Sequence, residues 1–73
     1  MKTCLITLRS PTYGMKAQRI LSEQRIANQP IKLGSEYSAK GCTHGIRFDC
    51  RDRHAVERLL RENAIPYSDI QSL

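Results

Sequence analysis

Hydrophobic and polar positions divide the chain into alternating strand-like and helix-like segments. Residues 3–8 are β-branched or apolar almost throughout, as in a buried strand. Residues 46–50 alternate with period two, which predicts a half-buried strand. Shorter strands are predicted at residues 31–33 and 67–73, and residues 34–45 are rich in Gly and Ser and are predicted to form a loop.

Two amphipathic helices are predicted between these strands. Ser10 is a suitable N-cap for the first, with Pro11 in its first turn, and apolar residues then recur at helical spacing until the Asn28–Pro30 region, which is predicted to end it. Asp52 is a plausible N-cap for the second, whose apolar stripe runs to the segment 63–66. The two helices therefore each follow a strand.

The two halves of the chain resemble each other. Residues 17–26 (AQRILSEQRI) match residues 56–65 (VERLLRENAI) at the Arg, Leu, Glu and Ile positions. Two βαβ-type halves predict an α+β fold of ferredoxin-like split βαββαβ type, in one domain spanning residues 1–73. Both helices are expected on one face of a four-stranded antiparallel sheet, which leaves the other face solvated or covered by a second subunit.

Length and composition narrow the class of protein. A domain of 73 residues has little room for an enclosed pocket, so a shallow site or one completed by a partner is expected. The apolar stretch at the N-terminus is short and ends at Arg9, so we expect neither a signal peptide nor a membrane span, and a cytoplasmic location follows. A net charge of +5 is compatible with an acidic partner, although the basic residues are scattered.

The three cysteines differ in their predicted surroundings. Cys4 and Cys50 lie on the apolar faces of their strands and are expected to be inert core residues, with free thiols in a reducing compartment. Cys42 lies between glycines in the sequence KGCTHG. Lys40 and His44 are close in sequence, and positive neighbours favour the thiolate, the reactive form of cysteine. Cys42 is therefore the candidate reactive residue; the alternative is an incidental loop cysteine beside an ordinary polar His44.

Other site types have less support. Cys42, His44, Cys50 and His54 are of the types that bind zinc, but an extended segment would separate Cys42 from Cys50 by about 20 Å or more, so no metal site is expected. RNA-binding split βαβ domains stack bases on sheet aromatics. Here Phe48 is predicted to face the core, and the tyrosines are dispersed at positions 13, 37 and 67. Nucleic-acid binding is thus only a third hypothesis.

One segment, GCTHGIRF at residues 41–48, resembles a known family. The chain is similar to the short bacterial domains of unknown function described as selenium/sulfur carrier protein-like. These domains open with a strand that ends in Phe or Leu and is followed by Arg-Ser, which corresponds to Leu8-Arg9-Ser10 here. The end of their last helix resembles residues 59–65, LLRENAI. The resemblance covers nearly the whole chain, but the family's usual Cys-Gly is Cys42-Thr43 here, and its Pro-Arg before the loop is Leu33-Gly34.

The resemblance implies a carrier in which Cys42 holds sulfur or selenium as a persulfide or selenopersulfide. Its expected partners are a donor enzyme such as a cysteine desulfurase and an acceptor protein, with no cofactor; the chain would be a carrier or binding protein and not an enzyme. The alternative, from a different class, is a non-catalytic interaction module that forms a homodimer or covers a partner through the open sheet face.

Overall fold

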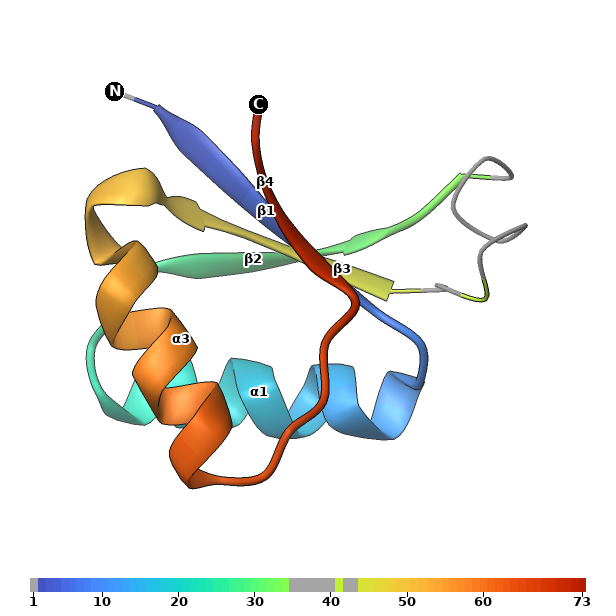
Figure 1. The fold of residues 1–73 in the computed structure, drawn as a ribbon, viewed down its shortest axis with the longest axis horizontal. Helices are drawn as coiled ribbons and strands as arrows, with labels where there is room; N and C mark the ends of the chain where they lie inside the picture. Colours follow the sequence, from blue (N-terminus) through green and yellow to red (C-terminus); the bar gives the residue numbers. More distant parts are fainter. Residues whose placement is uncertain (1, 35–40, 42–43) are drawn as a thin grey trace.

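The computed structural model describes residues 2–34, 41 and 44–73. Within them the chain forms an α+β fold in the order βαββαβ, with a short 3₁₀ turn before the last helix (Figure 1). The elements are β1 (Thr3–Leu8), α1 (Pro11–Glu23), β2 (Asn28–Lys32), β3 (His44–Asp49), η1 (Cys50–Asp52), α3 (Arg53–Glu62) and β4 (Asp69–Ser72).

The four strands form one antiparallel sheet in the order β2-β3-β1-β4. Ile6 at the centre of β1 pairs with Ile46 of β3 on one side and with Ile70 of β4 on the other. Both helices lie on the same face of the sheet, as the sequence predicts (Figure 1). The arrangement fits a ferredoxin-like fold in outline.

The core lies between this sheet face and the two helices. Phe48 is only 3% exposed, which confirms that the ring faces the helices and is not a base-stacking platform. Alternate residues of β1 and β3 contribute because successive side chains of a strand point to opposite faces. The fully buried side chains include Cys4, Ile6, Leu8, Leu21, Ile46, Val56 and Leu60.

The internal likeness of the two halves has a structural counterpart at the helix ends. In each helix the residue after the C-cap has a positive φ, +59° at Arg25 and +53° at Ala64. The amides of Ile26 and Ile65 then donate to carbonyls five residues back, at 2.9 Å in both cases. Both helices thus end in a Schellman motif, in which the matched isoleucines supply the hydrogen bond that spans five residues.

The boundaries of the first crossover differ from the prediction. The first helix ends at Glu23, and Asn28 to Pro30 do not end it but open β2, which stops at Lys32. Pro30 pairs with Ile46. A proline is acceptable there because β2 is an edge strand and has a neighbouring strand on one side only. Within the described residues, no strand on the outer side requires an N–H donor from this position. The start of α1 is as predicted: Ser10 accepts a hydrogen bond from the Thr12 amide at 3.2 Å.

The sheet face opposite the helices is partly covered by the chain itself. Leu33, just after β2, packs with Ile31 on Leu5, which is only 3% exposed. Elsewhere on this face Gln29, Arg47 and Asp69 are exposed. The apolar part of the open face is therefore small.

Candidate functional site

The segment that carries the predicted reactive cysteine lies between Gly34 and His44. Cys42 and Lys40 lie outside the described residues, as does Tyr37. His44 is described, and it is the first residue of β3, not part of the loop as predicted. It opens the strand because it pairs with Leu8 of β1 and with Lys32 of β2. The described part of the candidate site therefore consists of the residues that border this segment.

Gly45, the second residue of β3, lies beside β2, where it pairs with Ile31. A Cβ added there would lie 2.8 Å from Cδ2 of Leu33 and 2.9 Å from Cδ1 of Leu5. Carbon atoms do not approach so closely, so only glycine leaves room for Leu33 to pack across the sheet. Gly45 thereby makes room for Leu33, which follows β2, to pack beside Leu5.

The start of α1 also lies close to this segment, through the contact of Gly14 with His44. Gly14 is buried, and a Cβ added there would lie 3.5 Å from Cβ of His44, an ordinary contact. Gly41 has a φ of +83°, a region that other residues rarely adopt. A Cβ at Gly41 would lie 4.0 Å from Nε of Arg9. The residue that precedes Cys42 in the sequence is thus next to a guanidinium group.

Arg9 also borders an open cleft of about 500 Å³. The cleft lies between the β1–α1 connection and the α3–β4 connection, which is held beside β1 by a hydrogen bond of 2.8 Å from the Ser68 amide to the Thr7 carbonyl. Its walls are Arg9, Ser10, Tyr13, Pro66, Tyr67 and Ser68, and we call it the tyrosine cleft. The tyrosines are dispersed in the sequence, but the fold brings Tyr13 and Tyr67 into the wall of one cleft.

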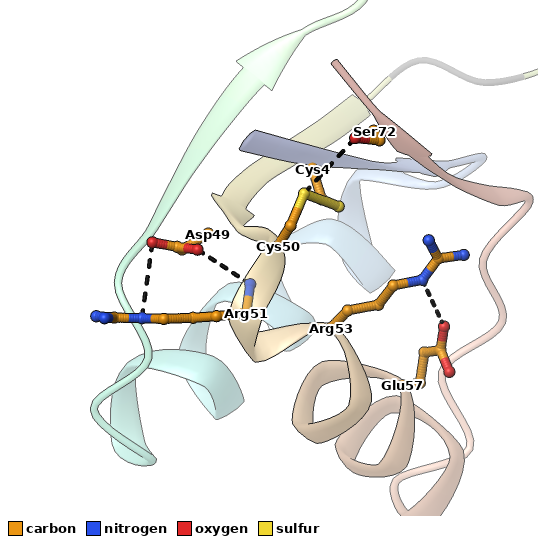
Figure 2. The surroundings of a disulfide bond; sticks show 7 residues. All are labelled: Cys4, Asp49, Cys50, Arg51, Arg53, Glu57 and Ser72. Atoms are coloured by element: carbon orange, nitrogen blue, oxygen red, sulfur yellow. Dashed lines mark hydrogen bonds and ion pairs between the residues drawn. A yellow bond between two sulfur atoms is a disulfide. The ribbon is translucent and has the colours of Figure 1, made fainter. Parts of the chain in front are cut away.

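The other two cysteines form a disulfide (Figure 2). The prediction of free thiols at Cys4 and Cys50 is therefore wrong. Cys50 is not in the third strand, as predicted, but begins η1, and its amide donates to the Lys2 carbonyl at 3.1 Å. This contact keeps Cys50 beside β1, and the two Cα atoms lie 5.0 Å apart, within the usual range for a disulfide.

The disulfide lies at the far end of β3 from His44. Cys4 is fully buried, whereas Cys50 is partly exposed. The Ser72 hydroxyl lies 3.9 Å from Sγ of Cys50 and is the only possible donor of the two, since a disulfide sulfur carries no proton (Figure 2). Asp49 accepts from the Arg51 amide at 3.0 Å and so stabilises the turn that presents Cys50. The six residues of β3 separate this pair from the segment that carries Cys42.

Among the described residues no His, Cys, Asp or Glu side chains gather as a potential metal site, and no helix is long and apolar enough to cross a bilayer. The predicted second N-cap, Asp52, stands at the right position but makes no side-chain hydrogen bond to the helix. Some exposed charges of the helices form ion pairs one turn apart, such as Arg19 with Glu23 at 3.7 Å. These pairs are part of a solvated helix surface.

Comparison with known proteins identifies the family to which the chain belongs. The family model described as Putative Se/S carrier protein-like matches residues 3–72, nearly the whole chain. The chain therefore belongs to this family of selenium and sulfur carrier-like proteins, as the resemblance predicts. No curated protein and no solved structure matches the chain.

Proposed function

We propose that this protein is a thiol-based carrier of sulfur or selenium and that Cys42 is the acceptor. Family membership supports a carrier, and the disulfide supports the choice of residue. The pairing of Cys4 with Cys50 is the observation that carries the assignment, because it leaves Cys42 as the remaining cysteine of three. A persulfide carrier needs a thiolate, and disulfide sulfurs cannot supply one.

The proposed chemistry is a sulfur transfer without net oxidation. The Cys42 thiolate attacks the outer sulfur of a donor persulfide, R–S–SH. A new S–S bond forms to Cys42 as the donor S–S bond breaks, and the electron pair leaves on R–S⁻. The products are the Cys42 persulfide and the donor thiolate. A selenopersulfide donor, R–S–SeH, reacts in the same way at selenium.

Positive charge near Cys42 is proposed to favour the attacking thiolate. Lys40 and His44 are its neighbours in the sequence, and the Arg9 guanidinium lies beside Gly41. Positive groups stabilise a thiolate over the neutral thiol. The glycines on either side of Cys42-Thr43-His44 are proposed to let a donor and then an acceptor approach the sulfur closely.

We assign the fold to the ferredoxin-like type and propose that its partners are proteins: a donor enzyme such as a cysteine desulfurase and an acceptor. The polar, self-covered open face of the sheet gives a homodimer little apolar area. The interaction-module alternative therefore gains no support from it.

The carrier function is tested by incubating the protein with a cysteine desulfurase and cysteine, followed by intact-mass measurement without reductant. The wild type is expected to gain the mass of sulfur, and the Cys42→Ser variant is expected to gain none. Circular dichroism of Cys42→Ser checks that it folds. Sulfur uptake by the folded variant, or none by the wild type, would contradict the proposal.

A further inference from the structure

Apart from Arg9, the residues of the tyrosine cleft have no part in the proposed carrier chemistry. It is built from two segments distant in the sequence, residues 9–13 and 66–68. Its volume of about 500 Å³ lies within the range of pockets that bind small molecules. A cleft of this size in so small a domain is a feature that a ligand could use.

The walls of the cleft combine a positive charge with aromatic surface. Arg9 contributes a guanidinium group, with several N–H donors, to the wall. Tyr13 and Tyr67 are each 38% exposed, so part of each side chain is accessible. A guanidinium binds carboxylates in a two-pronged geometry, and aromatic rings make favourable contacts with polarisable sulfur. The walls therefore suit a small molecule that carries both a carboxylate and sulfur.

Arg9 connects the cleft to the proposed acceptor. The same side chain that lines the cleft has its Nε near Gly41, and Gly41 directly precedes Cys42 in the sequence. The Thr12 amide at the start of α1 already donates to the Ser10 hydroxyl, so the Arg9 side chain is the proposed anchor for the ligand. A ligand bound through Arg9 would thus lie near Gly41, the residue that precedes the proposed acceptor in the sequence.

We infer that the tyrosine cleft binds a small carboxylate-bearing thiol or persulfide, so that Cys42 can take sulfur from a low-molecular-weight donor as well as from a protein. This inference rests on the proposed carrier function for its purpose. The carboxylate pairs with the Arg9 guanidinium, and the sulfur-bearing part lies between Tyr13 and Tyr67. The transfer step is the one given above, with the small persulfide as R–S–SH.

Binding is tested with S-methylglutathione, a carboxylate-bearing thioether that cannot reduce the Cys4–Cys50 disulfide. In ¹⁵N–¹H NMR titrations of the Cys42→Ser protein, we expect saturable shifts at the amides of residues 9, 10, 12, 13, 67 and 68. The dialkyl ester of the same compound, which lacks both carboxylates, should bind about tenfold more weakly, as expected for loss of a charged hydrogen-bond pair. Arg9→Gln should weaken binding of the acid by a similar factor, and Arg61→Gln, which removes an exposed charge on α3, should not.

Three results would overturn the inference: no shifts in the cleft at millimolar concentrations, equal affinity for the acid and the ester, or equal effects of Arg9→Gln and Arg61→Gln. A transfer assay with glutathione persulfide separates this inference from the carrier proposal. Sulfur uptake by Cys42→Ser would refute the carrier site whatever the cleft binds. Uptake as fast by Arg9→Gln as by wild type, with none by Cys42→Ser, would refute the cleft and leave the carrier standing.

Discussion

Reduction of the Cys4–Cys50 disulfide is expected to lower the free energy of unfolding by about 4 kcal/mol. The two cysteines are 46 residues apart, so the bond closes a loop that includes most of the chain. In the chain-entropy account, opening a loop of this length returns about 13 cal/mol/K to the unfolded state, which is about 4 kcal/mol at 25 °C. A domain of this size has a total stability of only about 4–11 kcal/mol. The disulfide is therefore expected to decide whether the fold is robust or marginal.

The measurement is urea denaturation followed by circular dichroism, with and without a phosphine reductant. Cys42→Ser is used throughout, because it removes thiol exchange from the loop and leaves the disulfide in place. Alkylation and mass measurement confirm the redox state of each sample. The oxidised protein should have a clearly higher midpoint than the reduced protein.

A double variant, Cys4→Ser with Cys50→Ser, serves as a control in which the reductant should have no effect. A change of less than about 1 kcal/mol between the oxidised and reduced Cys42→Ser protein would refute the reasoning, because the loop-closure effect would then be absent. A reductant effect of the same size in the double variant would show that the effect does not come from this bond.

Three further predictions concern packing and helix ends, each measured by urea denaturation. Ala64→Gly should raise the free energy of unfolding by about 1 kcal/mol, because glycine adopts the positive φ at the end of α3 without strain; a loss of stability would contradict the Schellman assignment. Gly45→Ala should lower it by about 1–3 kcal/mol, because the new methyl group overlaps Leu33. Gly34→Ala is the matched control, because a Cβ there meets no atom within 4 Å among the described residues beyond its chain neighbours; equal effects of the two variants would exclude the proposed contact. Leu21→Ala should cost about 2–5 kcal/mol, because it empties a fully buried position; a cost below 1 kcal/mol would place Leu21 outside the core.

The regular elements were predictable because their signals are local. The β-branched and apolar run at residues 3–8 identified β1 to the residue, and Ser10 with Pro11 identified the start of α1. The repeated Arg, Leu, Glu and Ile positions predicted two βαβ-type halves, but they gave no prediction that both helices end in the same motif. The end of α1 was placed too late, because the non-glycine residue Arg25 adopts the positive φ that usually marks a glycine.

The contacts between distant residues were less accessible from the sequence. Strand parity placed Cys4 and Cys50 on the same face, but their pairing depends on the register of β1 with β3 and on the turn that follows Asp49. The tyrosine cleft depends on the hydrogen bond from Ser68 to Thr7, which brings Tyr67 toward α1. A Pro-Tyr-Ser segment after a helix gives no sign of that contact.

The central claim, that Cys42 accepts the sulfur, is tested most directly by locating the added atom. After transfer from a desulfurase, the protein is alkylated without reductant and digested with trypsin, which places the three cysteines in separate peptides, residues 3–9, 41–47 and 48–51. We expect an alkylated persulfide on peptide 41–47, while peptides 3–9 and 48–51 remain joined by the disulfide. Added sulfur on either disulfide peptide, with unmodified Cys42, would contradict the account.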